Sequence, residues 1–270
     1  MSTSFASSRV ARSLALATTV LVLAACESTP PPTVRAKFAA PVPSEVLLPE
    51  RYAMLLERAR RGLLREEFPE TEISAHSLAK GMAARGSAAD ETFRGAYRES
   101  AKTSFASGAT HSYKTVSNLL APLPSDPQMA QQFPELLKVS DIPRIALETR
   151  NVKIPAWIYW FASEGDNDFH IILGSTAQLT SATIFMNSEI SALPGDDPAR
   201  LPFAQRRRDF RAIMAKNRNV GGLFDPPVAV RVSGSLLWDA EHRAPKAVGP
   251  KGLQPAKAWE IHPIKQLMGR

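Results

Sequence analysis

The sequence is poor in cysteine and has no compact metal-binding motif. Its 270 residues include one cysteine, Cys26, so an exported form of the protein would have no internal disulfide and would depend on its hydrophobic core. The five histidines include no HExxH pattern, so a metal site would have to be assembled by the fold from distant segments. Hydrophobic residues make up 44% of the chain, which is enough for a core and excludes a wholly disordered protein.

Long apolar runs are also scarce, and the one near the N-terminus is too short to span a bilayer as a mature helix. It extends from Ser13 to Ala25 and follows two arginines, Arg9 and Arg12. A basic start followed by an apolar stretch about half the length of a membrane span is typical of a secretory signal. We therefore predict a signal peptide over residues 1–25.

The predicted signal runs into the letters LAAC, in which small residues precede Cys26. This pattern resembles the bacterial lipoprotein signal, which implies that the Cys26 thiol receives a diacylglycerol and that the mature chain begins at this residue. Several acyl chains, palmitate among them, would give durable anchoring, whereas one chain gives reversible binding. In lipoproteins of enteric-type bacteria, an Asp after the cysteine retains the protein in the inner membrane. By this resemblance, Glu27 implies the outer membrane, facing the periplasm, over the inner membrane. The alternative is an incidental thiol in a conventional signal peptide or a short membrane anchor.

The chain carries a basic excess. Its 33 Lys and Arg against 26 Asp and Glu give a formal net charge of +7, which favours anionic neighbours. For a protein tethered in the cell envelope, we expect the partners to be the membrane itself, an envelope protein, or an anionic glycan or lipid. Nucleic acid is the less favoured partner.

The rest of the chain divides into three regions. Residues 26–48 are rich in proline and predict an extended tether. Residues 49–140 predict helices and irregular chain, and residues 141–270 predict a β domain. From Pro49 to Phe68, apolar residues recur every three or four positions. This spacing predicts an amphipathic helix that packs on the C-terminal domain, on another protein or on the membrane.

Apolar and β-branched runs in the C-terminal region predict five strands. They cover residues 144–163, 168–175, 183–190, 228–239 and 257–267. A helix is predicted over residues 203–217, between the third and fourth strands. Because this is the element order of the five-stranded OB barrel, we predict an OB-like barrel, with another small barrel or a sandwich as the alternative. Gly234, inside the fourth strand, predicts a bulge or a bend.

Histidines and carboxylates lie close together in this region. Residues two apart on a strand point to one face, about 6.5–7 Å from each other, so Asp168 should lie beside His170 and Glu260 beside His262. Imidazole and carboxylate groups bind zinc and other divalent ions, and a metal-bound water attacks phosphodiesters and esters. The alternative is structural: each histidine hydrogen-bonds a neighbouring carboxylate or carbonyl and closes its own strand end.

The segments DFHIIL, SEI, VRVSGSLLWDAEH and WEIHPI together resemble a group of exported bacterial domains of uncharacterised function. The resemblance covers residues 144–270 and implies a set of recurrent polar positions. These positions are Asp168, His170, Glu189, Asp239, His242, Glu260 and His262. The group brings no established activity, so the resemblance supports the fold more than a function.

The predicted helix also carries basic residues. It holds Arg206, Arg207, Arg208 and Arg211, which are candidate ligand-binding residues for an anionic partner. Tryptophans and tyrosines of the predicted strands could offer stacking surfaces, although strand alternation places several of them in the core. His76 and His111 have no second ligand at motif spacing and are predicted to be surface residues.

Two hypotheses for the function follow. The first is a non-enzymatic envelope lipoprotein whose C-terminal domain binds a ligand or a partner. The second is a metal-dependent hydrolase, of nuclease or phosphodiesterase type, that uses the polar cluster with a divalent metal as cofactor. The sequence assigns no catalytic residue under either hypothesis.

Overall fold

The computed structural model describes residues 48–66, 91–195 and 197–270. The predicted signal peptide, the lipidation site Cys26, all but the last residue of the tether, and His76 lie outside the described residues. Within the described ranges, no helix combines the length and the apolar character needed to cross a membrane.

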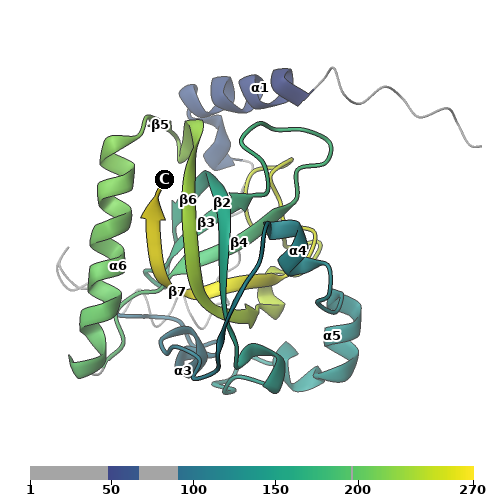
Figure 1. Cartoon of the computed structure of the whole chain (residues 1–270), viewed down its shortest axis with the longest axis vertical. Helices are drawn as coiled ribbons and strands as arrows, with labels where there is room; N and C mark the ends of the chain where they lie inside the picture. The colour runs from purple at the N-terminus through teal and green to yellow at the C-terminus, as the bar shows by residue number, and fades with distance from the viewer. Residues whose placement is uncertain (1–47, 67–90, 196) are drawn as a thin grey trace, which may run out of the picture. The chain divides into compact units, whose positions relative to one another are not determined.

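The described part of the C-terminal region is mainly β, as predicted (Figure 1). Its strands, together with one short strand from the region before it, form one seven-stranded mixed sheet. They are β1 (Thr110–Ser112), β2 (Asn151–Ser163), β3 (Phe169–Gly174), β4 (Phe185–Ile190), β5 (Asn219–Val220), β6 (Leu223–Trp238) and β7 (Trp259–Gly269). The helices are α1 (Leu48–Arg60), α3 (Glu99–Lys102), α4 (Val116–Leu120), α5 (Asp126–Gln132) and α6 (Asp197–Lys216). Short 3₁₀ turns cover Leu63–Glu66, Pro134–Leu137, Ala146–Glu148 and Ala240–His242.

Hydrogen bonding closes five of the strands into a ring. The order along the sheet is β1-β2-β3-β4-β7-β6-β5, and β2 pairs with β6 as well. The neighbours within the ring are antiparallel except β4 and β7, which run parallel. The short strands β1 and β5 extend the sheet beside β2 and β6. Chain segments far apart in the sequence, above all β4 and β7, therefore become neighbours.

The predicted order of three strands, a helix and two strands is confirmed, with shifted ends. The first strand begins at Asn151 because residues 146–148 form a 3₁₀ turn, which the Glu148 carboxylate stabilises by accepting from the backbone N–H of Ile145 at 3.0 Å. Helix α6 begins at Asp197 and contains Pro202, which the sequence had placed before the helix. The ladder between β6 and β7 shifts register on both sides of Gly234, so the predicted bulge is confirmed.

The predicted amphipathic helix begins at Leu48 but ends at Arg60, earlier than expected, because the chain turns at Arg61 and Gly62. Its buried face lies in a hydrophobic cluster with strand residues. The members from α1 are Leu55, Leu56 and Ala59. Tyr159 and Trp160 of β2 join them, so among the three surfaces considered, the helix packs on its own C-terminal region.

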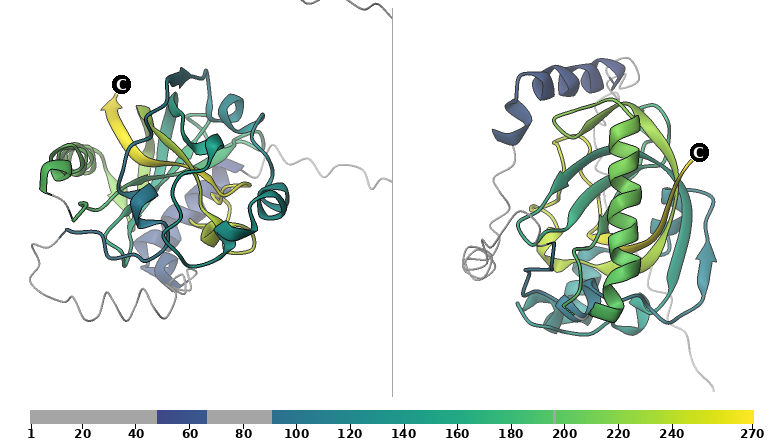
Figure 2. Two further views of the ribbon diagram at one scale, coloured as in Figure 1. Left: turned by 90° about the horizontal axis from the view of Figure 1, so that it is seen from below. Right: turned by 90° about the vertical axis from the view of Figure 1, so that its left-hand side faces the viewer.

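The large aromatic side chains of the strands are mostly internal. Tyr159, Trp238 and Trp259 are fully buried. Helix α6 packs against β7 and β4, where Phe210 enters the main hydrophobic cluster (Figure 2). These aromatics therefore stabilise the core, as strand alternation suggested for several of them, and they do not form an exposed stacking surface.

Two buried faces alternate along β3, β4 and β7. On β3, Phe169 and Ile171 join the main hydrophobic cluster, whereas His170 points to the opposite face. The ladder places His170 opposite Glu189 of β4. It also places Asn187 of β4 opposite Glu260 of β7. The second face thus gathers polar side chains from three strands.

Candidate metal centre

The structure brings together all seven polar residues singled out in the sequence. Each contacts at least one other member of the group through a nitrogen–oxygen distance of 4.0 Å or less. Three strands of the ring, with the residue just before β3, and the turn after a fourth strand supply the residues. They are Asp168 and His170 at β3, Glu189 on β4, Asp239 and His242 at the turn after β6, and Glu260 and His262 on β7. We call this group the polar centre.

Glu189 lies in the middle of the polar centre. Its Oε1 is 2.5 Å from Nε2 of His170, and its Oε2 is 2.9 Å from Nδ1 of His262. Its carboxylate is fully buried. The two oxygens of one side chain therefore face histidines from two different strands.

His242 faces three carboxylates at distances longer than a hydrogen bond. Its Nδ1 lies 3.5 Å from Oδ2 of Asp239, 4.0 Å from Oε2 of Glu260 and 4.0 Å from Oε1 of Glu189. Among the described residues this nitrogen has no hydrogen-bond partner. Its ring meets that of His170 edge-on, with centroids 4.8 Å apart. His242 thus lies among three acidic oxygens, each within ion-pair distance but none hydrogen-bonded to its Nδ1.

His262 makes closer contacts on both sides of its ring. Its Nδ1 is 2.9 Å from Oε1 of Glu260, the pair predicted to share one face of the strand. Its Nε2 is 3.3 Å from Oδ2 of Asp168. The other oxygen of Asp168 accepts from the backbone N–H of Ala192 at 2.6 Å, which fixes the orientation of this carboxylate. The backbone carbonyl of His262 is held in turn by Arg144 at 2.9 Å.

Two members of the neighbourhood were missed in the sequence. Lys102, at the end of α3, places its Nζ 2.9 Å from Oδ2 of Asp239, and both side chains are buried. Nothing in the sequence near Lys102 points to this role. Asn187 donates to Glu189 at 3.0 Å and to Glu260 at 2.7 Å. Its position two residues before Glu189, on the same face of a strand, could have identified it.

The histidines and Glu189 shift one another's protonation. Burial favours the neutral form of Glu189, but His170 and His262 outweigh it and hold its pKa well below the usual range. Burial also acts against the charged form of His170, yet Glu189 and Glu164 raise its pKa to about 10. Burial also acts against the charged form of His262, but Glu189 outweighs it and raises the pKa of this ring well above its usual value. Protons on these histidines therefore balance the buried carboxylates whenever no other cation does so.

The remaining carboxylates differ from one another. Burial, with Asp166 adding to it, raises the pKa of Asp168 to about 7. Asp239 shifts the opposite way: burial is outweighed by Lys102 and His242, which lower its pKa. Lys102 and His242 therefore favour the ionised form of Asp239, whereas burial and Asp166 favour the protonated form of Asp168.

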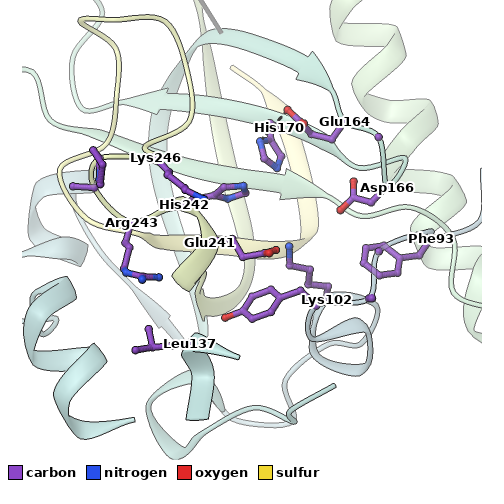
Figure 3. A pocket seen from close by; sticks show the side chains of 16 residues that line it. Phe93, Lys102, Leu137, Glu164, Asp166, His170, Glu241, His242, Arg243 and Lys246 are labelled. Atoms are coloured by element: carbon purple, nitrogen blue, oxygen red, sulfur yellow. Dashed lines mark ion pairs between the residues drawn. The ribbon is translucent and has the colours of Figure 1, made fainter. Parts of the chain in front are cut away.

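A cavity of about 300 Å³ reaches the polar centre from one side (Figure 3). His170, His242 and Lys102 line it, together with Glu164 of the β2–β3 loop and Glu241 beside His242. The remaining members of the centre do not border it and are fully buried or nearly so. The centre therefore has an edge that a small molecule can reach and a sealed interior.

Three combinations of these residues place potential ligand atoms within 4.8 Å of one another. Two overlap and lie toward the cavity; we call their members the outer set, which comprises His170, Glu189, Asp239, His242 and Glu260. The third lies in the interior; this inner set comprises Asp168, Glu189 and His262. Imidazole nitrogens and carboxylate oxygens are ligands of zinc, manganese and iron, so both sets have suitable donors for a divalent ion.

The arginines of α6 do not converge on one site. Arg207 is buried and donates to the carbonyls of Asn167 and Ser191, so it is not available to a ligand. The other three contact acidic or amide side chains on or near the helix: Arg206 contacts Asp209, Arg208 contacts Gln205, and Arg211 contacts Glu91. His111 is exposed on β1, as predicted.

Comparison of the chain with protein-family models, with curated proteins and with solved structures gave no match.

Proposed function

We propose that the ring of strands is an OB-like barrel. Five strands, with one helix between the third and fourth, make up the OB fold, and the closed pairing of β2 with both β3 and β6 supports this assignment. OB folds bind ligands on the face of their second and third strands and through the loops that join strands one to two and four to five. Counted within the ring, these are β3, β4 and the loops that contribute Glu164 and His242 to the cavity.

We propose that this site binds a divalent metal ion through the outer set. The observation that carries the proposal is His242 Nδ1, a buried nitrogen with three carboxylate oxygens at 3.5–4.0 Å and no hydrogen bond among the described residues. Atoms bound at about 2.0–2.2 Å to one ion lie roughly 3.3 Å apart in a tetrahedron and farther apart at wider angles. The distances of 3.5–4.0 Å between His242 Nδ1 and these oxygens therefore suit ligands of one shared ion better than direct hydrogen bonds.

The donor set indicates which ions fit. Three carboxylates and one or two imidazoles favour manganese, iron or zinc over a soft thiolate-seeking ion. Lys102 forms an ion pair with Asp239, and Asn187 donates to the two glutamates; both orient these carboxylates from behind, as outer-shell partners do in metal sites.

The test is metal content and affinity of the full chain, purified without chelator and then titrated with Mn²⁺ or Zn²⁺. We expect at least one ion per chain, and a loss of affinity of more than about tenfold in His242→Ala. His111→Ala, which removes an exposed histidine on β1, is the matched control and should bind normally. A wild-type chain that binds neither ion, with His242→Ala destabilised, would instead establish the hydrogen-bonded structural alternative.

A second candidate function is hydrolysis. The cavity borders the outer set, so a water bound to an ion there would face a space large enough for a small substrate, beside the cation Lys102. A divalent ion lowers the pKa of such a water and makes it a nucleophile near neutral pH. Metal-dependent cleavage of bis(p-nitrophenyl) phosphate or p-nitrophenyl acetate, abolished in His242→Ala, would establish this function. No cleavage at full metal occupancy would leave a ligand-binding module.

We also propose that the protein is a lipoprotein of the cell envelope, held at the outer membrane by acylated Cys26, with an envelope protein or an anionic glycan or lipid as partner. The LAAC pattern after an apolar run supports this proposal, as does the resemblance to exported bacterial domains. Replacing Cys26 by Ser should abolish labelling with radioactive palmitate and release the chain from the membrane fraction. A variant that stays membrane-bound and normally processed would contradict lipidation.

A further inference from the structure

We propose that the polar centre holds two divalent ions, one in the outer set and one in the inner set, with Glu189 bridging them. The inference deepens the proposed metal function and rests on it. Carboxylates bridge pairs of ions in two-metal sites, where the ions lie about 3.5–4 Å apart. Glu189 is the one residue that the outer and inner sets share.

The two oxygens of Glu189 point toward different ligands. Oε1 faces His170 at 2.5 Å and His242 at 4.0 Å, both members of the outer set. Oε2 lies 2.9 Å from Nδ1 of His262 in the inner set, the ring nitrogen that also faces Glu260, and makes no hydrogen bond of acceptable geometry with any described residue. This division of one carboxylate between two sets of ligands is what a bridge requires.

The inner set has free ligand atoms aimed at one another. Oδ2 of Asp168 and Nε2 of His262 lie 3.3 Å apart, are fully buried, and make no hydrogen bond of acceptable geometry with described residues. In the neutral tautomer that donates from Nδ1 to Glu260, Nε2 of His262 keeps its lone pair. Metal-bound histidines usually donate their second ring nitrogen to a carboxylate in this way.

The charge of the centre also favours a second cation. Four buried carboxylates, Asp168, Glu189, Asp239 and Glu260, face one lysine, Lys102. With the histidines neutral, as metal ligands are, Lys102 and one divalent ion supply three positive charges against four carboxylates, and buried charges are stable only when they are compensated. The second ion would bind where Asp168 is, away from Lys102.

The two sites would differ in access. His170 and His242 of the outer set border the cavity, so an ion there keeps a coordination position open to solvent or to a ligand. None of Asp168, Glu189 and His262 borders it. Closed sites are typical of structural ions and open sites of catalytic ones. We therefore assign a structural role to the inner ion, which joins β3, β4 and β7, and ligand chemistry to the outer one.

The experiment counts Mn²⁺ ions bound to the full chain and records their electron paramagnetic resonance. We expect two ions per chain in the wild type, with a spectrum broadened by coupling between them. Asp168→Asn keeps the acceptor for Ala192 but removes the inner ligand, so it should bind one ion with an uncoupled six-line spectrum. Asp239→Asn should also bind one ion. The control Asp126→Asn alters a carboxylate that bonds Trp238 and Ala258 outside the centre, and should bind two.

The outcomes separate this inference from the metal function itself. One ion in the wild type, unchanged in Asp168→Asn and lost in Asp239→Asn, would overturn the second ion and leave the proposed function intact. Absence of bound Mn²⁺ and Zn²⁺ in the wild type would overturn both. If Asp168→Asn does not fold, the wild-type spectrum decides, because uncoupled Mn²⁺ at saturation contradicts a bridged pair.

Discussion

Replacement of Lys102 by Met should lower the thermal stability of the metal-free protein more than that of the metal-bound protein. Lys102 is 3% exposed and is the lysine that faces the buried carboxylates, with its Nζ 2.9 Å from Asp239. Methionine keeps most of the side-chain volume and removes the charge. Asp239 then becomes a buried anion whose strongest fixed counter-charge is missing, and a divalent ion in the outer set can supply it.

The size of the effect follows from the burial of the pair. Breaking a buried ion pair by removing one partner costs about 3–5 kcal/mol. For a folded part of this size, each kcal/mol corresponds to roughly 2–4 °C in the melting temperature, so the metal-free variant should melt about 6–20 °C lower. An ion at a hundred times its Kd adds about 2.7 kcal/mol to the wild type. It should add more to Lys102→Met, because the ion then compensates a charge that is otherwise unpaired.

The assay is thermal unfolding of wild type and variant, each with a chelator and with saturating Zn²⁺. Arg98→Met is the matched control, because Arg98 forms a fully buried pair with Glu148 at 2.5 Å outside the polar centre. Both variants should be destabilised in chelator, but metal should narrow the gap to wild type only for Lys102→Met. If metal changes the difference in melting temperature from wild type by the same amount for both variants, an ion does not replace the charge of Lys102, and the reasoning is refuted.

Two further predictions concern pH and the sheet. Because Glu189 and Glu164 raise the pKa of His170 to about 10, this ring is protonated in the metal-free protein at pH 7.5 and must lose its proton to bind an ion. Metal binding should therefore release at least one proton and tighten by at least about tenfold per pH unit between pH 6.5 and about 10. Calorimetry in two buffers of different ionisation heat measures this release, and heats independent of the buffer would contradict it. Gly234→Ala should cost about 1–3 kcal/mol, measured by denaturant unfolding, because its Cβ would lie 2.3 Å from the carbonyl oxygen of Pro263. Gly269→Ala on β7, with open space around it, should leave stability within about 0.5 kcal/mol, and equal costs for the two variants would be inconsistent with a bulge that needs glycine.

The strand pattern in the sequence was sufficient for the element order but not for the pairing. Alternation and β-branched runs located β3, β4 and β7 within a few residues. The two-residue strand β5 and the three-residue strand β1 were missed, because so short a segment has no period to detect. Pairing is long-range: the contact between β4 and β7 joins Asn187 to Glu260, and no local feature of either segment specifies its partner.

The same division applies to the polar centre. The spacing of two residues placed Glu260 and His262 on one strand face, and their side chains do meet at 2.9 Å. Lys102 could not be found in this way, because it reaches Asp239 from a four-residue helix through tertiary packing alone. Arg207 shows the opposite failure, since a basic helix face suggested a ligand site where burial shows a structural residue.

The geometry also narrows the choice between chemistry and structure at the histidines. If each histidine only closed its own strand end, each would pair with the carboxylate nearest to it in sequence. His262 does pair with Glu260, and His242 lies nearest to Asp239. However, Glu189 also contacts His170 and His262 from two other strands, and His242 lies among three acids that come from three segments. Such shared partners join the seven residues into one network of contacts. A hydrogen bond that closes a loop needs only one partner. A metal ion with several ligands needs side chains from several segments to face one another, because each segment supplies a ligand.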